Sequence, residues 1–168
     1  MRKILIFAGI ATLIFGVFII DRFRVPDYEP PRAIDLPETL DFSKNDITGK
    51  RIALSDYKNQ PVILKFFATW CGSCNAMTPD VIALHKNYPD IKIIGLSLDE
   101  DPELVRDYQA KQAIPYPLVM LDEALNKQYS DIRVIPTLLF LDRDHQLVDY
   151  TTGYQNYDDL KDLIQPLL

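Results

Sequence analysis

The two cysteines of this chain, Cys71 and Cys74, lie three residues apart at the junction of two sequence patterns. Before them, residues 61–68 form a β-branched and aromatic run that is typical of a buried central strand. After them, apolar residues recur at helical spacing through residues 71–87. The sequence therefore predicts a strand–turn–helix unit with the cysteine pair at the start of the helix.

That placement suits thiol–disulfide chemistry. A thiolate attacks a disulfide, and the unpaired N–H groups at a helix N-terminus stabilise negative charge on the first sulfur. A separation of three residues brings Cys74 within bonding reach of Cys71, so the second sulfur can resolve a mixed disulfide. Gly72 and Ser73 are small and leave the first sulfur accessible, and Trp70 directly precedes it. We therefore interpret the pair as redox-active.

Composition argues against other classes of protein. A disulfide-stapled scaffold would have several cysteines, and a structural zinc site would need about four ligands, for which only the isolated His85 and His145 remain. The net charge is −6 with both signs interspersed, and no basic cluster suits nucleic acid. Hydrophobic residues make up 48%, enough for a core. No metal or cofactor is expected.

The N-terminal segment predicts a membrane anchor at residues 1–23. An uncharged run from Ile4 to Ile20 spans roughly 26 Å as a helix, which is enough for a thin bilayer core. The alternative is a cleaved signal peptide, but the charged residues Asp21, Arg22 and Arg24 make a poor cleavage site. Basic residues flank both ends of the run, so we base the extracytoplasmic placement of the remaining chain on the shortness of the N-terminal tail. Residues 24–38, with four prolines, are interpreted as a spacer or a disordered tail.

Residues 39–168 predict one α/β domain with a mixed sheet, because strands alternate with helices before a final hairpin and helix. A first hairpin has arms at residues 40–42 and 52–54, and Leu160, Leu163, Ile164, Leu167 and Leu168 line one face of the last helix. The expected strands are residues 61–68, 91–98, 116–121, 137–141 and 146–151, and the expected helices are 71–87, one from 101, 125–129, and one from about 157.

Two motifs carry a family resemblance. Residues 66–74, Phe-Phe-Ala-Thr-Trp-Cys-Gly-Ser-Cys, resemble the active-site stretch of the thioredoxin superfamily, and Val134-Ile135-Pro136-Thr137 is similar to its second motif. The anchor and the segments Leu-Ser-Asp-Tyr (54–57) and Leu-Ser-Leu-Asp (96–99) are similar to those of membrane-anchored TlpA/ResA/DsbE-type proteins. The resemblance implies a thioredoxin-like fold, with Cys71 attacking and Cys74 resolving. It also implies a cis Ile135–Pro136 bond beside the cysteines, and substrate binding by Trp70, Ile135 and Pro136.

The chain departs from the family pattern at three positions. Met77 stands where the subgroup commonly has a glutamate, Lys65 stands where thioredoxin has a buried aspartate, and Ser73 replaces a frequent proline. Two interpretations of Lys65 remain open. It is either a buried modulator of the cysteine pKa values or a lysine whose stem runs along apolar surface while its amine reaches water.

The resemblance implies a thiol–disulfide oxidoreductase on the periplasmic side of a bacterial inner membrane. Its expected partners are protein disulfides and a membrane or periplasmic electron donor, and we expect the reducing direction. One alternative is copper binding with His145 or His85, the first predicted in a solvated turn and the second at an exposed helix position. A second alternative is disulfide donation, although no segment between Cys74 and Pro136 is long enough for the helical insertion of a strong oxidase.

Overall fold

A five-stranded sheet forms the centre of the computed structural model, which describes residues 41–168. The strand order is β5-β4-β3-β6-β7. The three strands β3, β4 and β5 are parallel, whereas β6 runs antiparallel to β3 and β7 antiparallel to β6. Their bounds are Val62–Phe67 (β3), Lys92–Ser97 (β4), Leu118–Met120 (β5), Thr137–Leu141 (β6) and Leu147–Thr152 (β7). The expected mixed sheet is confirmed.

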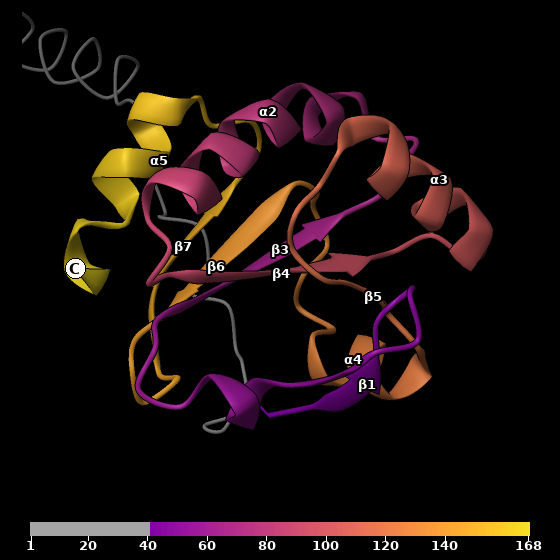
Figure 1. The fold of residues 1–168 in the computed structure, drawn as a ribbon, viewed down its shortest axis with the longest axis horizontal. Helices are drawn as coiled ribbons and strands as arrows, with labels where there is room; N and C mark the ends of the chain where they lie inside the picture. Colours follow the sequence, from indigo (N-terminus) through magenta and orange to yellow (C-terminus); the bar gives the residue numbers. More distant parts are fainter. Residues whose placement is uncertain (1–40) are drawn as a thin grey trace, which may run out of the picture. The chain divides into compact units, whose positions relative to one another are not determined.

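Helices cover both faces of this sheet (Figure 1). On one face lie α2 (Gly72–Asn87), α3 (Pro102–Gln112) and α5 (Tyr157–Leu163), which the short helix η2 (Gln165–Leu167) follows. On the other face lie α4 (Glu123–Gln128), η1 (Leu54–Tyr57) and a separate two-stranded sheet of β1 (Ser43–Asn45) and β2 (Arg51–Ala53). This is the three-layer arrangement expected of an α/β domain.

The central strand β3 alternates between two cores. Val62, Leu64 and Phe66 point into the core beneath α4 and η1, whereas Ile63 and Phe67 point toward α2 and α3. All six residues of β3 are buried, as a strand covered on both faces requires. Lys65 belongs to the second set by this alternation, so the sheet directs it toward α2.

Close packing explains a glycine in the neighbouring strand. Gly95 of β4 pairs with Lys65, and a Cβ built on Gly95 would lie 2.4 Å from Cδ2 of Leu118 and 3.1 Å from Cε1 of Phe67. No side chain fits at this position unless Leu118 moves. Glycine thus permits β5 to pack tightly beside the strand that carries Lys65.

The structure corrects the bounds of several predicted elements. The first hairpin pairs residues 43–45 with 51–53, so its first arm begins after Phe42 rather than before it. Cys71 is the N-cap of α2 rather than a helical residue. Leu168 does not join the buried face of the last helix but is 62% exposed, because α5 ends at Leu163 and a 3-10 turn with Pro166 follows. The predicted anchor and the whole predicted spacer, residues 1–38, and the first two residues of the predicted domain lie outside the described residues. Within residues 41–168 no helix has the length and apolar character needed to span a bilayer.

Candidate active site

The two cysteines form a disulfide at the N-terminal end of α2. The Cys71–Cys74 S–S distance is 2.13 Å and the two Cα atoms are 5.2 Å apart. The backbone N–H of Cys74 donates to Sγ of Cys71 at 3.2 Å, and Oγ of Ser73 lies 3.4 Å from the same sulfur. The N-cap sulfur thus faces the N–H groups that begin the helix, where negative charge is favoured.

The two sulfurs differ in accessibility. Cys71 is 7% exposed, whereas Cys74 is fully buried. Trp70, directly before the pair, is 71% exposed and Val134 is 55% exposed, which is unusual for large apolar side chains. Cys71 is therefore the more accessible of the two sulfurs, and exposed apolar side chains stand next to both motifs.

A network of hydrogen bonds fixes the loop that leads into the cysteines. The buried carboxylate of Asp99, just after β4, accepts from the backbone N–H of Thr69 at 2.9 Å and from its hydroxyl at 2.6 Å. The hydroxyl of Ser97 donates to the same carboxylate at 2.7 Å. From α2, the Asn75 amide donates to the Thr69 carbonyl at 3.0 Å. Strand β4 and helix α2 together hold Thr69, and through it the position of Cys71.

The second predicted motif lies beside the pair. The Ile135–Pro136 peptide bond is cis, as the resemblance implied. The carbonyl oxygen of Ile135 lies 3.9 Å from Sγ of Cys71. Pro136 is buried and its carbonyl accepts from the N–H of Gly153 at 2.8 Å, which ties this segment to the end of β7. The structure thus brings Trp70, Ile135 and Pro136 to the disulfide.

Lys65 is buried beneath the same helix. Its side chain is 1% exposed, so the interpretation in which the amine reaches water is wrong. Nζ donates to the hydroxyl of Thr78 at 2.9 Å, and Oγ1 of Thr78 lies 2.9 Å from the Cys74 carbonyl and 2.7 Å from the hydroxyl of Tyr108. Burial lowers the pKa of Lys65 to about 7.

The histidines considered for copper lie elsewhere. His145 lies in the turn after β6, as predicted, but it is half-buried rather than fully solvated, and its Nε2 lies 3.2 Å from the carbonyl of Tyr57. His85 is also half-buried rather than exposed. It lies on a side of α2 that faces the rest of the domain, and its ring is 5.8 Å from that of Tyr116. In residues 41–168 no three metal-ligating side chains come together.

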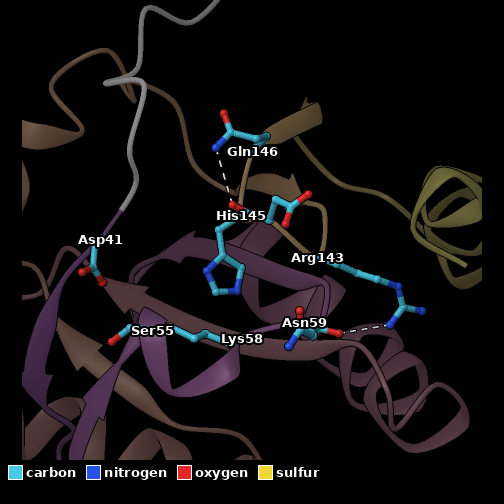
Figure 2. A pocket seen from close by; sticks show the side chains of 8 residues that line it. Asp41, Ser55, Lys58, Asn59, Arg143, His145 and Gln146 are labelled. Carbon is cyan, nitrogen blue, oxygen red and sulfur yellow. Dashed lines mark hydrogen bonds between the residues drawn. The ribbon is translucent and has the colours of Figure 1, made fainter.

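His145 instead lines a polar cavity of about 370 Å³ (Figure 2). Val62 pairs with Leu141 at one end of the sheet and Phe66 with Thr137 at the other. The cavity lies beside the Val62–Leu141 end, and the cysteines lie just beyond the Phe66–Thr137 end. The cavity and the disulfide are therefore at opposite ends of β3. The cavity is lined by Asp41, Ser55, Lys58, Asn59, Arg143, Asp144, His145 and Gln146.

Comparison with known proteins identifies the family of this chain. The sequence model of the AhpC/TSA family matches residues 37–150, more than half of the chain. The chain belongs to the AhpC/TSA family. It is 28% identical over 134 residues to the thiol-disulfide oxidoreductase ResA of Bacillus thuringiensis subsp. konkukian, covering 77% of this chain and 76% of that relative. With a cysteine pair closed into a disulfide at a helix start, this family member is a thiol–disulfide oxidoreductase.

Solved structures confirm the thioredoxin-like fold. A thioredoxin-family thiol:disulfide interchange protein from Chlorobium tepidum TLS superimposes with a TM-score of 0.72 and 24% identity, over 83% of this chain and 99% of that one. StoA from Bacillus subtilis superimposes with a TM-score of 0.66 and 24% identity, over 77% and 100% of the two chains.

Sequence reasoning missed the polar residues that surround the pair. Thr78 and Tyr108 lie on different helices and meet only through the fold. Asp99 was noted only as part of a segment that resembles the family. An acidic residue directly after a buried strand could have indicated a side chain that accepts hydrogen bonds from a neighbouring loop. Thr78 had a weaker signal, since it stands one helical turn after Cys74 on the buried face.

Proposed function

We propose that this oxidoreductase reduces disulfides of proteins outside the cytoplasmic membrane, with Cys71 as the attacking thiol and Cys74 as the resolving thiol. The observation that carries the assignment of roles is the unequal burial of the two sulfurs, 7% exposure against none. Only the outer sulfur has a surface that a protein disulfide can approach.

In the proposed reaction, the Cys71 thiolate attacks one sulfur of the substrate disulfide. A Cys71–substrate mixed disulfide forms and the other substrate sulfur leaves as a thiolate. Cys74, as a thiolate, then attacks Sγ of Cys71, the internal disulfide closes, and the second substrate sulfur leaves. An electron donor in the membrane or periplasm restores the dithiol. The start of α2 stabilises the thiolate at Cys71.

We assign substrate binding to Trp70, Ile135 and Pro136. The exposed ring of Trp70 offers apolar area next to the sulfur, and the backbone of Ile135 lies close enough to accompany an extended substrate segment. Such backbone pairing gives affinity with little dependence on the substrate's side chains, which suits an enzyme that accepts protein segments.

The assignment of roles is tested by trapping. The full chain with Cys74→Ser is expected to accumulate mixed disulfides with a disulfide-bonded peptide, because no sulfur resolves them. Cys71→Ser is expected to lose exchange and to form no adduct. Ser73→Ala, which leaves both sulfurs in place, is the matched control and should exchange. Adducts that form through Cys74 in the Cys71→Ser variant would reverse the two roles.

The location rests on the N-terminal sequence. We propose that residues 1–23 anchor the chain, residues 24–38 hold the domain away from the bilayer, and residues 39–168 face the periplasm. A thiol reagent that does not cross membranes should modify reduced Cys71 in intact cells whose outer barrier has been opened. Labelling only after lysis of the inner membrane would place the domain in the cytoplasm. Release into the soluble fraction would indicate a cleaved N-terminus.

A further inference from the structure

A lysine buried without a carboxylate partner is unusual, because lysine is rarely buried unless it is paired. Among residues 41–168 no ion pair includes Lys65. Its polar partner is the neutral hydroxyl of Thr78, and its amine also lies 5.6 Å from the centroid of the Phe67 ring. The site therefore disfavours a permanent positive charge and tolerates a neutral amine.

The amine lies against the turn of α2 that contains the resolving cysteine. Thr78, which accepts its hydrogen bond, follows Cys74 by one helical turn, and Oγ1 of Thr78 lies 2.9 Å from the Cys74 carbonyl. Cys74, Thr78 and Lys65 are all buried to 1% exposure or less. Water therefore screens little of any interaction between a charge on Lys65 and a charge on the cysteines.

Few other titratable groups face this amine. From α3 comes the phenol of Tyr108, whose pKa burial raises, with the Thr78 bond opposing this and nearby Asp99 adding to it. Asp99, after β4, is engaged by Thr69 and Ser97. The strand residues paired with Lys65 are Gly95 and Leu138, which carry no charge. The group at this helix turn whose charge changes during the reaction is therefore the cysteine pair.

We propose that Lys65 is a redox-linked proton site, whose amine takes up a proton when the Cys71–Cys74 disulfide is reduced and releases it when the disulfide closes. The proposal rests on the proposed function and deepens it. The disulfide is neutral and leaves the buried amine neutral. Reduction creates a thiolate at the start of α2, and this negative charge favours an ammonium in the low-dielectric space beneath it. Lys65 is thus a positioning residue that acts on the sulfurs through their electrostatic surroundings.

The step balances with a dithiol as reductant. The donor dithiol gives up two electrons and two protons and becomes a disulfide. The Cys71–Cys74 bond breaks, one sulfur takes a proton to become a thiol, and the other remains a thiolate. The second proton goes to the amine of Lys65. When the enzyme later reduces a substrate disulfide, the same two electrons and two protons pass to the substrate sulfurs.

The direct test is an NMR titration of the Lys65 side chain in the full chain, once in the disulfide form and once in the dithiol form held by a phosphine reductant. The expected midpoint is about 7 in the disulfide form. In the dithiol form we expect a proton affinity at least tenfold higher. An unchanged midpoint would overturn the proposal and leave Lys65 as a structural tie between β3 and α2. Because the reductant is chemical, this result does not depend on whether protein disulfides are substrates.

A second test measures the reduction potential of the pair as a function of pH. Each extra proton taken up with two electrons changes the exchange equilibrium tenfold per pH unit, or about 30 mV. Between about pH 7 and the higher midpoint of the dithiol form, the amine is neutral in the disulfide form and protonated in the dithiol form, so wild type should show a steeper slope than Lys65→Met by up to this amount. Below about pH 6 the slopes should agree.

Lys92→Met is the matched control for that test. Lys92 is a β4 lysine that pairs with Val62 at the end of the sheet remote from the cysteines. Its variant should keep the wild-type slope. Equal slopes for wild type and Lys65→Met over the whole range would overturn the proposal. If Lys65→Met did not fold, the wild-type NMR titration would still decide the question.

Discussion

The two faces of the central sheet differ in what they bury. Strand β3 sends Leu64 toward α4 and η1, where its neighbours on the same face of the strand, Val62 and Phe66, are apolar. The adjacent Lys65 points the opposite way, toward α2 and α3, where Thr78 and Tyr108 also bury polar atoms. Both faces are equally inaccessible to solvent, so burial alone does not explain the difference. Lys65, Thr78 and Tyr108 thus place a linked set of polar groups on the face that carries the cysteines.

Moving the lysine by one residue should have the largest effect. Leu64→Lys would bury an amine among apolar side chains on the face away from Thr78, and would also remove the packing of Leu64. We expect a loss of more than about 5 kcal/mol in the free energy of unfolding, enough to unfold the domain. Urea unfolding followed by circular dichroism measures it, and Leu64→Met is the control. A folded, near-wild-type variant would show that the two faces do not differ.

Removing the lysine from its natural position should increase the free energy of unfolding rather than decrease it. The pKa of Lys65 is lowered from 10.5 to about 7, which corresponds to a penalty on the order of 5 kcal/mol in the disulfide form, partly offset by the Thr78 hydrogen bond. Between about pH 7 and 10.5 the unfolded chain holds a proton that the folded chain lacks, so this contribution to stability rises with pH. The penalty is complete below about pH 7 and disappears above about pH 10.5.

Lys65→Met is therefore expected to be a few kcal/mol more stable than wild type near pH 6. That advantage should shrink as pH rises toward 10, and urea titrations of the disulfide form at several pH values measure the trend. A difference that does not vary with pH would contradict the lowered pKa, and a less stable variant at every pH would assign Lys65 a stabilising role.

The tight contact beside the lysine should have a smaller effect. Gly95→Ala places a methyl group 2.4 Å from Cδ2 of Leu118 unless that side chain moves. Overpacking of this kind costs about 1–3 kcal/mol. Thermal unfolding checks it. The double variant with Leu118→Val should recover part of the loss, whereas a neutral Gly95→Ala would indicate slack between β4 and β5.

The smallest expected effect is at Tyr108. Tyr108→Phe removes the hydroxyl that lies 2.7 Å from Oγ1 of Thr78 but keeps the ring stacked on Phe67, with centroids 5.8 Å apart. One such hydrogen bond contributes about 0.5–1.5 kcal/mol to stability. A larger loss would mean that Tyr108 holds the amine in place through Thr78. The Lys65 titration of the same variant would then show a displaced midpoint.

Local patterns predicted most of the fold and the centre of the site. The buried strands were predicted to within a residue of β3, β4 and β6, because most residues in each of these runs are apolar. The cysteine pair and the Ile135–Pro136 segment were found from motifs. The partners of Lys65 were not, because Thr78 and Tyr108 meet it only after three elements pack together. The partial burial of His145 was not predicted for the same reason, since its contact with Tyr57 joins residues that are distant in sequence.

The reduction potential of the Cys71–Cys74 couple at neutral pH tests the proposed direction of the reaction most directly. Equilibration of the full chain with a thiol–disulfide buffer, read out by alkylation of the free cysteines, gives the value. We expect it to lie nearer to thioredoxin, at about −270 mV, than to a strong oxidase, at about −120 mV. A value near the oxidase would contradict the reducing role and indicate that the protein donates disulfides.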